Sequence, residues 1–357
     1  MHRICAPRTR RGHIRFLYCY PVSALLDQAA DRTPPIAVAI VSWNTRELLE
    51  QALRSLVPDA EAGRAQVWVV DNGSTDGSAA MVRERHPWVT LVASEENLGF
   101  GAAINLVAER TRGPWLVASN ADVMVTPGTL AQLQRTAERH PRVGMVGPRL
   151  LLLDGSTQPS VQPFPGLRIA ILSALHADRF SARAARAMRT VDAWESDAAA
   201  PVPWVTGALA LIARAAFEQA GGFDPDQWLY GEDLDLCWRI RACGWQIAYD
   251  PGACAHHAHS AAATLRFGQA ALDSHIAAVN HLWMLRRRGA FQTRASAVLG
   301  VIDAASRTAV LTPAARRAPS RFGDRAGRAR WALRQQFLGL RSERWLAQHA
   351  RRARDGD

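Results

Sequence analysis

The sequence has no lysine, few cysteines and no long uncharged apolar run. All 43 basic residues are arginine, a bias that we attribute to a GC-rich genome rather than to function. The five cysteines make an odd number and include no Cys-x-x-Cys pair, which argues against a disulfide framework and favours a reducing, cytoplasmic compartment. No window contains about 18 uncharged apolar residues, so we expect no transmembrane helix.

Charge is distributed unevenly along the 357 residues. Residues 1–35 hold six Arg and two Asp, residues 36–279 hold 20 Arg and 25 acids, and residues 280–357 hold 17 Arg and five acids. The net charges are therefore +4, −5 and +12. The middle is an ordinary globule, whose core the 48% apolar composition supports. We expect residues 1–35 to be a disordered basic leader, or the product of a start codon placed too early, because Pro21 interrupts their apolar run.

Strand and helix patterns alternate from residue 36 onward. Apolar runs of the parallel-sheet type predict buried strands at 36–43, 65–72, 89–94 and 114–122. Asn44 and Glu47 resemble a capping box that starts a helix after the first strand. This alternation predicts a doubly wound, mostly parallel α/β sheet, whose ligands bind at the carboxyl ends of the strands.

Later segments continue the pattern less regularly. Residues 205–223 predict a strand followed by a helix that ends at Gly221 and Gly222. Residues 245–259 predict an edge strand that runs into a loop at Pro251. Beyond about residue 262 the pattern is helical and basic.

Three carboxylates, Glu232, Asp233 and Asp235, follow Gly231 in an apolar and aromatic setting. Ionised side chains are rarely buried without a partner, so one interpretation is a cleft that holds a general base and acceptor-binding groups. The other is a helix N-terminus, where the helix dipole stabilises acids in the first turn. This segment alone favours neither.

Polar residues also follow two of the predicted strands. Asp71 begins the turn DNGSTDG, which suits recognition of a base and ribose but equally a tight turn with a helix cap. Asn120-Ala121-Asp122 ends the fourth predicted strand, and Thr126 supplies a better cap for the next helix. Asp122 is therefore available to bind a divalent cation that bridges a diphosphate.

Two apparent motifs do not support the function that they suggest. The run from Asn97 to Asn105 has Ile104 where a dinucleotide-binding fingerprint has its third glycine, and it follows the third strand rather than the first, which argues against a dehydrogenase. The cluster Cys254, His256, His257 and His259 matches no common zinc spacing. A single catalytic-metal ligand and solvated loop histidines both remain open.

In this order, the motifs resemble the family 2 inverting glycosyltransferases, and in particular their rhamnosyltransferase-type branch. The resemblance spans residues 36–262 and is carried by VSWNTRELL, VVDNGSTDGS, NLGFGAAIN, VASNADV and GGFDPDQWLYGEDLDLCWRIR. It implies a GT-A fold with a Rossmann-like nucleotide-binding half over 36–262, with 263–357 left as a basic helical extension. It also implies a nucleotide-diphospho-sugar donor, either dTDP- or UDP-linked, and a divalent cation, Mg²⁺ or Mn²⁺.

The resemblance also assigns roles to single residues. The positions that match the family's donor-binding segments are Ser42, Asn44, Glu47, Asp71, Asn72, Asn97, Gly99, Asn105 and Asn120. Asp122 matches the metal-binding acid of the Asp-x-Asp or Asn-Pro-Asp element, although Ala121 replaces the proline. Glu232 and Asp233 match the family's acceptor ligand and general base. His257 lies about where the family has a metal- or phosphate-contacting histidine, and His256 and His259 are close enough to compete.

The C-terminal region adds a second expectation. Trp331, Leu338 and Trp345 recur every seven residues among arginines, so one helix could present an aromatic and aliphatic stripe. Such a helix suits an anionic membrane surface or a lipid-diphosphate acceptor. A solvated extension or a homodimer contact is the alternative, and the acidic middle argues against nucleic acid.

The resemblance implies an enzyme that transfers a sugar, with rhamnose as the candidate, to a cell-envelope glycan or lipid-linked acceptor at the inner face of the membrane. Asp233 would deprotonate the acceptor hydroxyl in a single displacement with inversion. The alternative is a noncatalytic nucleotide-sugar or glycan-binding protein, against which the presence of both Asp122 and Asp233 argues. A nucleotidyltransferase would need a glycine- and Lys/Arg-rich phosphate loop, which SWNTRELL is not.

Overall fold

The computed structural model describes residues 36–177, 180–181, 183–184, 197–258, 268–317 and 319–355. The chain divides into two compact units. The first consists of the chain up to Val161, Ala193–Gln227 and Glu232–His259, and the second of Gln162–Asp192, Trp228–Gly231 and Ser260–Asp357. The basic leader expected at 1–35 lies outside the described residues.

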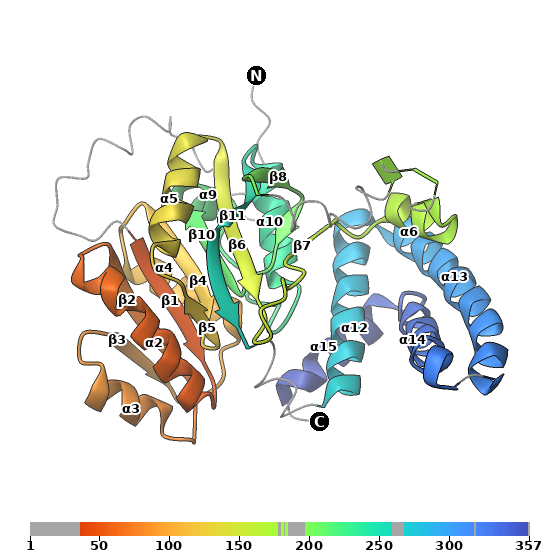
Figure 1. Ribbon diagram of the computed structural model, residues 1–357, viewed down its shortest axis with the longest axis horizontal. Helices are drawn as coiled ribbons and strands as arrows, with labels where there is room; N and C mark the ends of the chain where they lie inside the picture. Colours follow the sequence, from red (N-terminus) through yellow and green to blue (C-terminus); the bar gives the residue numbers. More distant parts are fainter. Residues whose placement is uncertain are drawn as a thin grey trace. The chain divides into compact units, whose positions relative to one another are not determined.

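Repeated strand-helix units build one half of the sheet in the first unit. Its parallel strands lie in the order β3-β2-β1-β4 and span β1 (Ile36–Ser42), β2 (Ala65–Asn72), β3 (Thr90–Ser94) and β4 (Trp115–Asn120). The connecting helices are α2 (Arg46–Glu61), α3 (Ser78–Arg85) and α4 (Phe100–Arg110). This half confirms the parallel, doubly wound arrangement that the alternating pattern predicts (Figure 1).

The other half of the sheet is mixed. It continues from β4 with β10 (Leu209–Ala213), β6 (Val143–Leu151), β11 (Gln246–His257) and β5 (Val123–Val125), and β8 (Ala200–Val202) pairs with β11. Only the β6–β11 pair is parallel here; β10, β5 and β8 run antiparallel to their neighbours. β7 (Val161–Gln162) and β9 (Trp204–Val205) form a separate two-stranded ladder.

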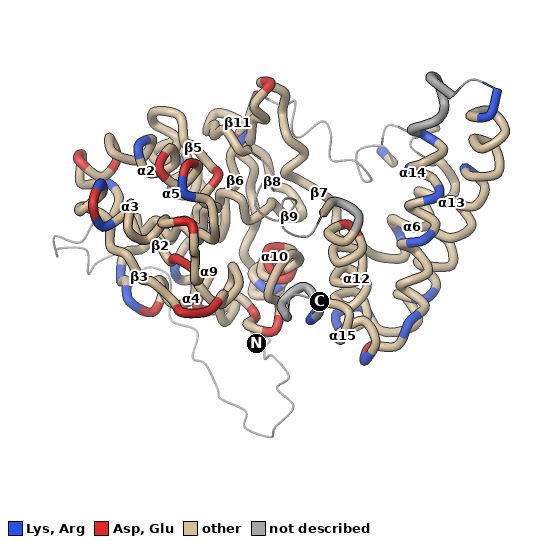
Figure 2. Tube along the Cα trace, turned by 90° about the horizontal axis from the view of Figure 1, so that it is seen from below, with Lys and Arg blue, Asp and Glu red and all other residues tan. Residues whose placement is uncertain are grey.

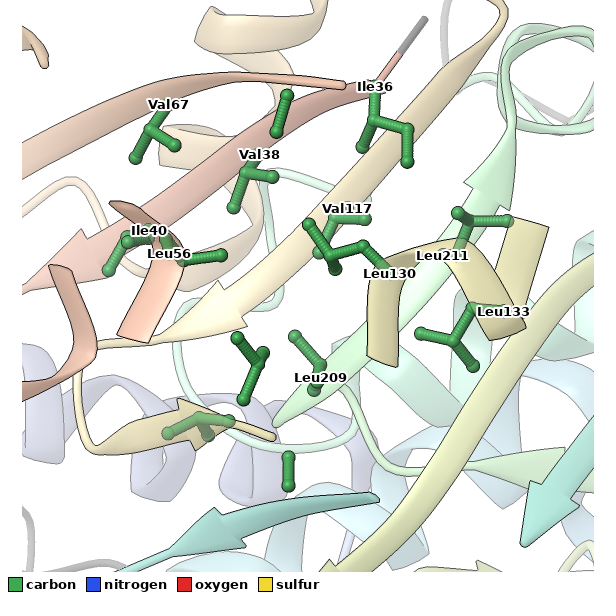
Figure 3. Close-up of a cluster of buried hydrophobic side chains, with 14 of the residues drawn as sticks. Ile36, Val38, Ile40, Leu56, Val67, Val117, Leu130, Leu133, Leu209 and Leu211 are labelled. Carbon is green, nitrogen blue, oxygen red and sulfur yellow. The ribbon is translucent and has the colours of Figure 1, made fainter. Parts of the chain in front are cut away.

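Helices cover both faces of this sheet because the side chains of a strand alternate between its faces. Ile36, Val38 and Ile40 of β1 join one buried cluster with Leu56 of α2 and residues of α5 (Thr129–Arg139) (Figure 3). The helices α4, α9 (Arg214–Gln219) and α10 (Glu232–Ala242) pack on the opposite face. Helices therefore cover both faces of the sheet, and the strand ends remain as the place where a ligand can reach it.

The expectation of an edge strand that ends at Pro251 is wrong. β11 continues through Pro251 to His257 and lies inside the sheet, between β6 and its partners β5 and β8. The pairing with β6 shifts register between Asp250 and Cys254. Proline is tolerated at such an irregularity because no ladder hydrogen bond from its nitrogen is required there.

The second unit is helical. Its helices are α6 (Leu167–Ala174), α12 (Gln269–Arg288), α13 (Ala290–Arg317), α14 (Pro319–Leu338) and α15 (Glu343–Asp355). Ala278 and Leu282 of α12 and Leu346 of α15 are its buried centre, and α13 packs along α14 and α6. Among the helices that the structure describes, α13 is long and apolar enough by length and composition to cross a membrane. Residues 162–192 and 228–231, which the sequence places with the first domain, belong to this unit.

The single helix expected to carry Trp331, Leu338 and Trp345 does not form. α14 ends at Leu338, and a turn at Gly339 separates it from α15, which carries Trp345. Leu338 and Trp345 pack against the buried centre of the helical unit, so they are not part of an exposed stripe. The spacing of Leu338 and Trp345 reflects core packing from two helices, whereas Trp331 is exposed.

Candidate active site

Strand register brings the predicted donor-binding residues to one edge of the sheet. Ser42 of β1 lies opposite Asp71 of β2, and Val41 lies opposite Asn120 of β4. The Asn120 amide donates to Ala208 O at 2.9 Å, which places the start of β10 at the same level. Carboxyl ends of neighbouring strands are where open α/β sheets bind ligands.

Asn44 ties the loops after β1 and β2 together rather than capping α2. It has a left-handed φ of 52°. Its side-chain Oδ1 accepts from Thr75 N at 2.8 Å, and its backbone N–H donates to Ser74 Oγ at 2.9 Å. The capping-box expectation is therefore wrong. Asp76 supplies the cap, because its Oδ2 accepts from Arg46 N at 2.9 Å and its Oδ1 from Ser78 N at 3.0 Å. One carboxylate thus joins the first turns of α2 and α3.

Asp71 and Asn72 are buried at the end of β2 and keep acceptor atoms available for a ligand. Asp71 Oδ2 accepts from Ser74 N at 3.1 Å, and Asn72 Nδ2 donates to Gly99 O at 3.3 Å. The other oxygens, Asp71 Oδ1 and Asn72 Oδ1, have no hydrogen-bond partner among the described residues. A buried acceptor without a donor is costly, and a bound imide or hydroxyl group would satisfy it.

The loop before α4 is fixed close to Asn72. Asn97 Oδ1 accepts from Gly99 N at 2.9 Å, and Gly99 has a φ of 85°, which glycine adopts without strain. Because Gly99 O also accepts from Asn72, this loop is held against the end of β2. Asn97 and Gly99 therefore shape the edge of the sheet at which Asp71 and Asn72 lie.

Asp122 and His257 meet at the far side of this edge. Asp122 Oδ1 lies 3.2 Å from His257 Nε2, and both side chains are buried. The backbone holds them in place, because His257 pairs with Val123 and the Ala258 amide donates to Asp122 O at 3.0 Å. Asn120 Nδ2 lies 3.5 Å from the same His257 Nε2.

Gln158 orients the imidazole of His257. The His257 Nδ1–H donates to Gln158 Oε1 at 2.7 Å, and Gln158 is itself buried. Because the proton is on Nδ1, Nε2 is unprotonated and faces Asp122. This is the tautomer in which Nε2 can bind a metal ion. Sequence reasoning missed Gln158, because a single glutamine between two strands carries no motif.

Asp122 and His257 fit a divalent cation. They provide an oxygen and a nitrogen ligand, and the Gln158 bond is the kind of outer-shell contact that accompanies metal-binding histidines. Across the part of the chain that the structure describes, no group of three or more His, Cys, Asp or Glu side chains is arranged around a common point. Mg²⁺ commonly binds to one or two carboxylates together with phosphate oxygens, so an incomplete protein cage suits a cation shared with a diphosphate.

Glu232 and Asp233 start α10 after two residues with left-handed φ, Tyr230 at 63° and Gly231 at 78°. Asp233 Oδ2 accepts from Gly207 N at 2.8 Å and its Oδ1 from Leu234 N at 2.7 Å. Gly207 directly precedes Ala208, the backbone partner of Asn120. Asp233 is therefore anchored at the same sheet edge as Asn120.

The two carboxyls differ in their surroundings. Burial and then the charge of Asp233 raise the pKa of Glu232 to about 8, and Glu232 Oε2 is buried without a partner among the described residues. Burial also raises the pKa of Asp233, but the Gly207 and Leu234 amides oppose that rise by stabilising its ionised form. The two carboxyls titrate as a coupled pair, in which burial favours the protonated form of Glu232 and two amides favour the ionised form of Asp233.

The third carboxylate of this segment has a structural role. Asp235 is fully buried, and its Oδ2 accepts from Arg239 Nε at 2.6 Å. The same guanidinium donates to the carbonyls of Ala220 and Gly222, so the pair fastens the end of α9 to α10. Of the three carboxylates, only Glu232 and Asp233 therefore remain as groups that could contact a substrate.

Four of the five further candidates show no side-chain contact with the site residues described above: Asn105, Glu47, Ser42 and His256 make other contacts or are exposed, and His259 is not described. The Asn105 carboxamide makes two hydrogen bonds of 2.9 Å to the backbone of Phe223: Nδ2 donates to the carbonyl, and Oδ1 accepts from the N–H. Its role is therefore structural. Glu47 is exposed on the first turn of α2, and Ser42 Oγ pairs with Thr45 Oγ1 at 3.0 Å. His256 pairs through its backbone with Met124 and is only half-buried, and His259 lies outside the described residues.

Comparison with known proteins agrees with this geometry. The family described as "Glycosyltransferase like family 2" matches residues 34–271. The N-acetylglucosaminyl-diphospho-decaprenol L-rhamnosyltransferase of Mycobacterium tuberculosis is 34% identical over 247 residues, which are 64% of this chain and 78% of that protein. The rhamnosyltransferase WbbL of Escherichia coli is 37% identical over 59 residues, which are 16% of this chain and 22% of WbbL.

A solved structure supports the same fold. The mannosyltransferase PcManGT of Pyrobaculum calidifontis, solved with GDP-Man and Mn²⁺, superposes with a TM-score of 0.53 at 22% identity and covers 89% of this chain and 92% of its own. The match confirms the GT-A fold with C-terminal helices. Together with the match over residues 34–271, it shows that the chain is an enzyme of glycosyltransferase family 2.

Proposed function

We propose that this enzyme transfers rhamnose from a nucleotide-diphospho-sugar, dTDP- or UDP-linked, to a lipid-linked diphosphate-sugar acceptor of the cell envelope. The observation that carries the proposal is the placement of Asp233 and the Asp122–His257 pair at the edge of the sheet where Asp71 and Asn72 keep free acceptor atoms. The relative from M. tuberculosis, which is named for a rhamnosyl group and a decaprenol-linked N-acetylglucosamine acceptor, supports the choice of substrates.

Asp233 is the proposed general base. It would take the proton of the acceptor hydroxyl while that oxygen forms its bond to the anomeric carbon and the bond to the diphosphate oxygen breaks. The configuration at the anomeric carbon then inverts. The Gly207 and Leu234 amides fix the Asp233 carboxylate in position and favour its ionised form, which a base requires.

Glu232 is the proposed acceptor ligand. With a pKa of about 8 it is protonated at neutral pH and can donate a hydrogen bond as well as accept one. Its unpartnered Oε2 is then satisfied by an acceptor hydroxyl.

Negative charge develops on the diphosphate as it leaves, and a nearby positive charge would stabilise it. A divalent cation bound by Asp122 and His257 would neutralise the charge that develops on it. Asp71, Asn72 and the loop held by Asn97 would bind base and ribose, and Asn120 would lie beside the sugar diphosphate. We also keep the reducing, cytoplasmic location as part of the proposal, because five cysteines without a Cys-x-x-Cys pair argue against a disulfide framework.

The test is a transfer assay with purified protein. Labelled dTDP-rhamnose and a polyprenyl-diphosphate N-acetylglucosamine acceptor should give a labelled lipid and dTDP, and UDP-rhamnose and dTDP-glucose are the matched donor controls. Transfer of another sugar in preference would replace rhamnose in the proposal. Absence of nucleotide release with every donor, in the presence of Mg²⁺ or Mn²⁺, would contradict it.

A further inference from the structure

The outward face of α13 is apolar over most of its length. Residues spaced three or four apart lie on one face of a helix. The exposed residues with this spacing on α13 are Phe291, Arg294, Val298, Ile302, Ala305, Ala309, Pro313 and Arg316. The face carries no charge between Arg294 and Arg316, and the uncharged part from Val298 to Pro313 is about 22 Å long. We call this set the α13 face.

Large side chains on and beside this face are open to solvent. Phe291 is 78% exposed, Ile302 57% and Val298 46%, and the neighbouring Val310 is 72% exposed. The acid of this helix lies elsewhere: Asp303 accepts from Arg307 Nε at 2.9 Å and lies 3.5 Å from His176 Nε2. A continuous apolar strip of this kind marks an interaction surface.

Basic residues lie at both ends of the α13 face and on the neighbouring helix α14. Arg316 and Arg317 end α13, and α14, which packs along it, exposes Arg325, Arg328, Arg330 and Arg334. Figure 2 shows basic residues recurring along both helices. The same helix exposes Trp331 at 41% and Phe337 at 49%. Apolar side chains next to arginines and aromatic rings are the composition of segments that lie in a bilayer interface.

We propose that the α13 face, with the arginines that end α13 and line α14, docks on a bilayer that contains anionic phospholipid. Charge selects this occupant over a second copy of the chain, because two such basic surfaces would repel each other. α13 lies on the surface rather than crossing it, since it packs along the arginine-rich α14 and carries the Asp303–Arg307 pair in its middle.

Docking would bring the enzyme to a lipid-linked acceptor, and that consequence alone rests on the proposed function. Binding to the bilayer does not need donor, metal or acceptor. A failure of the transfer assay and a failure of bilayer binding are therefore independent results.

The test is co-sedimentation of the full chain with vesicles of phosphatidylcholine alone or with phosphatidylglycerol. We expect binding that requires phosphatidylglycerol and weakens at high salt. The double variant Val298→Glu, Ile302→Glu should reduce binding more than tenfold, and Arg316→Gln with Arg317→Gln should reduce it about fivefold per residue. The matched control is Leu153→Glu, because Leu153 is 75% exposed in the sheet unit and should bind like wild type.

Thermal unfolding checks that each variant folds, and exposed positions should change stability little. Absence of wild-type binding to phosphatidylglycerol vesicles would overturn the proposal, as would equal binding by wild type and the double variant. A wild-type dimer that the double variant dissociates, without vesicle binding, would assign the face to a second copy. Resistance of the bound protein to alkaline carbonate extraction would show a crossing helix and would also overturn surface docking.

Discussion

At the scale of single residues, the two acids at the start of α10 differ in the hydrogen bonds that they receive. Asp233 receives two backbone N–H groups and Glu232 Oε2 receives none from the described residues. Amide donors favour the ionised form of a carboxyl, and burial without donors favours the protonated form. Spacing alone could not assign these roles, because adjacent residues in one motif have the same sequence environment.

Replacement of Glu232 should reveal its raised pKa in the pH dependence of stability. A folded pKa of about 8, above the ordinary 4.5, means that wild type loses stability as the pH rises from about 4.5 to about 8. Glu232→Gln removes that loss, about 1.4 kcal/mol for each unit of pKa shift. Urea unfolding should therefore show the variant and wild type to be similar at pH 5 and the variant more stable at pH 8. An equal difference at both pH values would contradict this explanation.

Gln158 should determine how firmly His257 can hold a cation. Gln158→Leu removes the acceptor of the Nδ1–H bond and should weaken Mn²⁺ binding about 10- to 100-fold. Gln158→Glu keeps an acceptor and should preserve the affinity. Calorimetry with Mn²⁺ in the presence of dTDP measures both variants without turnover. If Gln158→Leu binds Mn²⁺ as tightly as wild type, Gln158 does not position His257.

At the scale of elements, the loops after β1 and β2 are locked by one carboxylate. Asp76 accepts from the Arg46 amide at the start of α2 and from the amide and hydroxyl of Ser78 at the start of α3. Burial opposes ionisation, but these bonds outweigh it and lower the pKa of Asp76. The donor-binding loops are therefore held by contacts distant in sequence.

Removal of this double cap should destabilise the sheet unit. Asp76→Ala should cost about 2 kcal/mol, because each lost helix cap costs about 1 kcal/mol. Asp154→Ala is the matched control, since Asp154 makes the same bonds to Ser156 in an exposed turn that caps no helix. Its cost should stay below about 0.5 kcal/mol. Equal midpoints of urea unfolding for both variants would remove the capping role of Asp76.

Local patterns predicted the strand-helix alternation and the strand ends that carry Asp71, Asn120 and Asp122. They failed where a distant partner decides the structure. Asn44 has the sequence of a cap but bonds to Ser74 and Thr75 on another loop. Pro251 predicts the end of a strand, but β11 continues through it, and the pairing of β11 with β6 shifts register there. These outcomes depend on pairing between strands, which a single window of sequence does not contain.

At the scale of the whole molecule, the charge pattern distinguishes an acidic globule from a basic helical region. It does not predict which segments make up the second unit. That unit includes α6 and residues 228–231, which lie within the sequence of the sheet unit. The stripe expected from Trp331, Leu338 and Trp345 is interrupted by a turn, and the exposed apolar face belongs to α13 instead. Helical spacing shows which residues share a face, but only packing shows which face is covered.

The most direct test of the account is single-turnover transfer by Asp233→Asn with labelled dTDP-rhamnose and the lipid-linked acceptor. Asp226→Asn is the control, because Asp226 is an exposed acid in the preceding loop. We predict that Asp233→Asn transfers about 10²- to 10⁴-fold more slowly but binds donor with unchanged affinity, while Asp226→Asn behaves like wild type. Wild-type transfer by Asp233→Asn would contradict the assignment of this sheet edge as a catalytic site with Asp233 as its base.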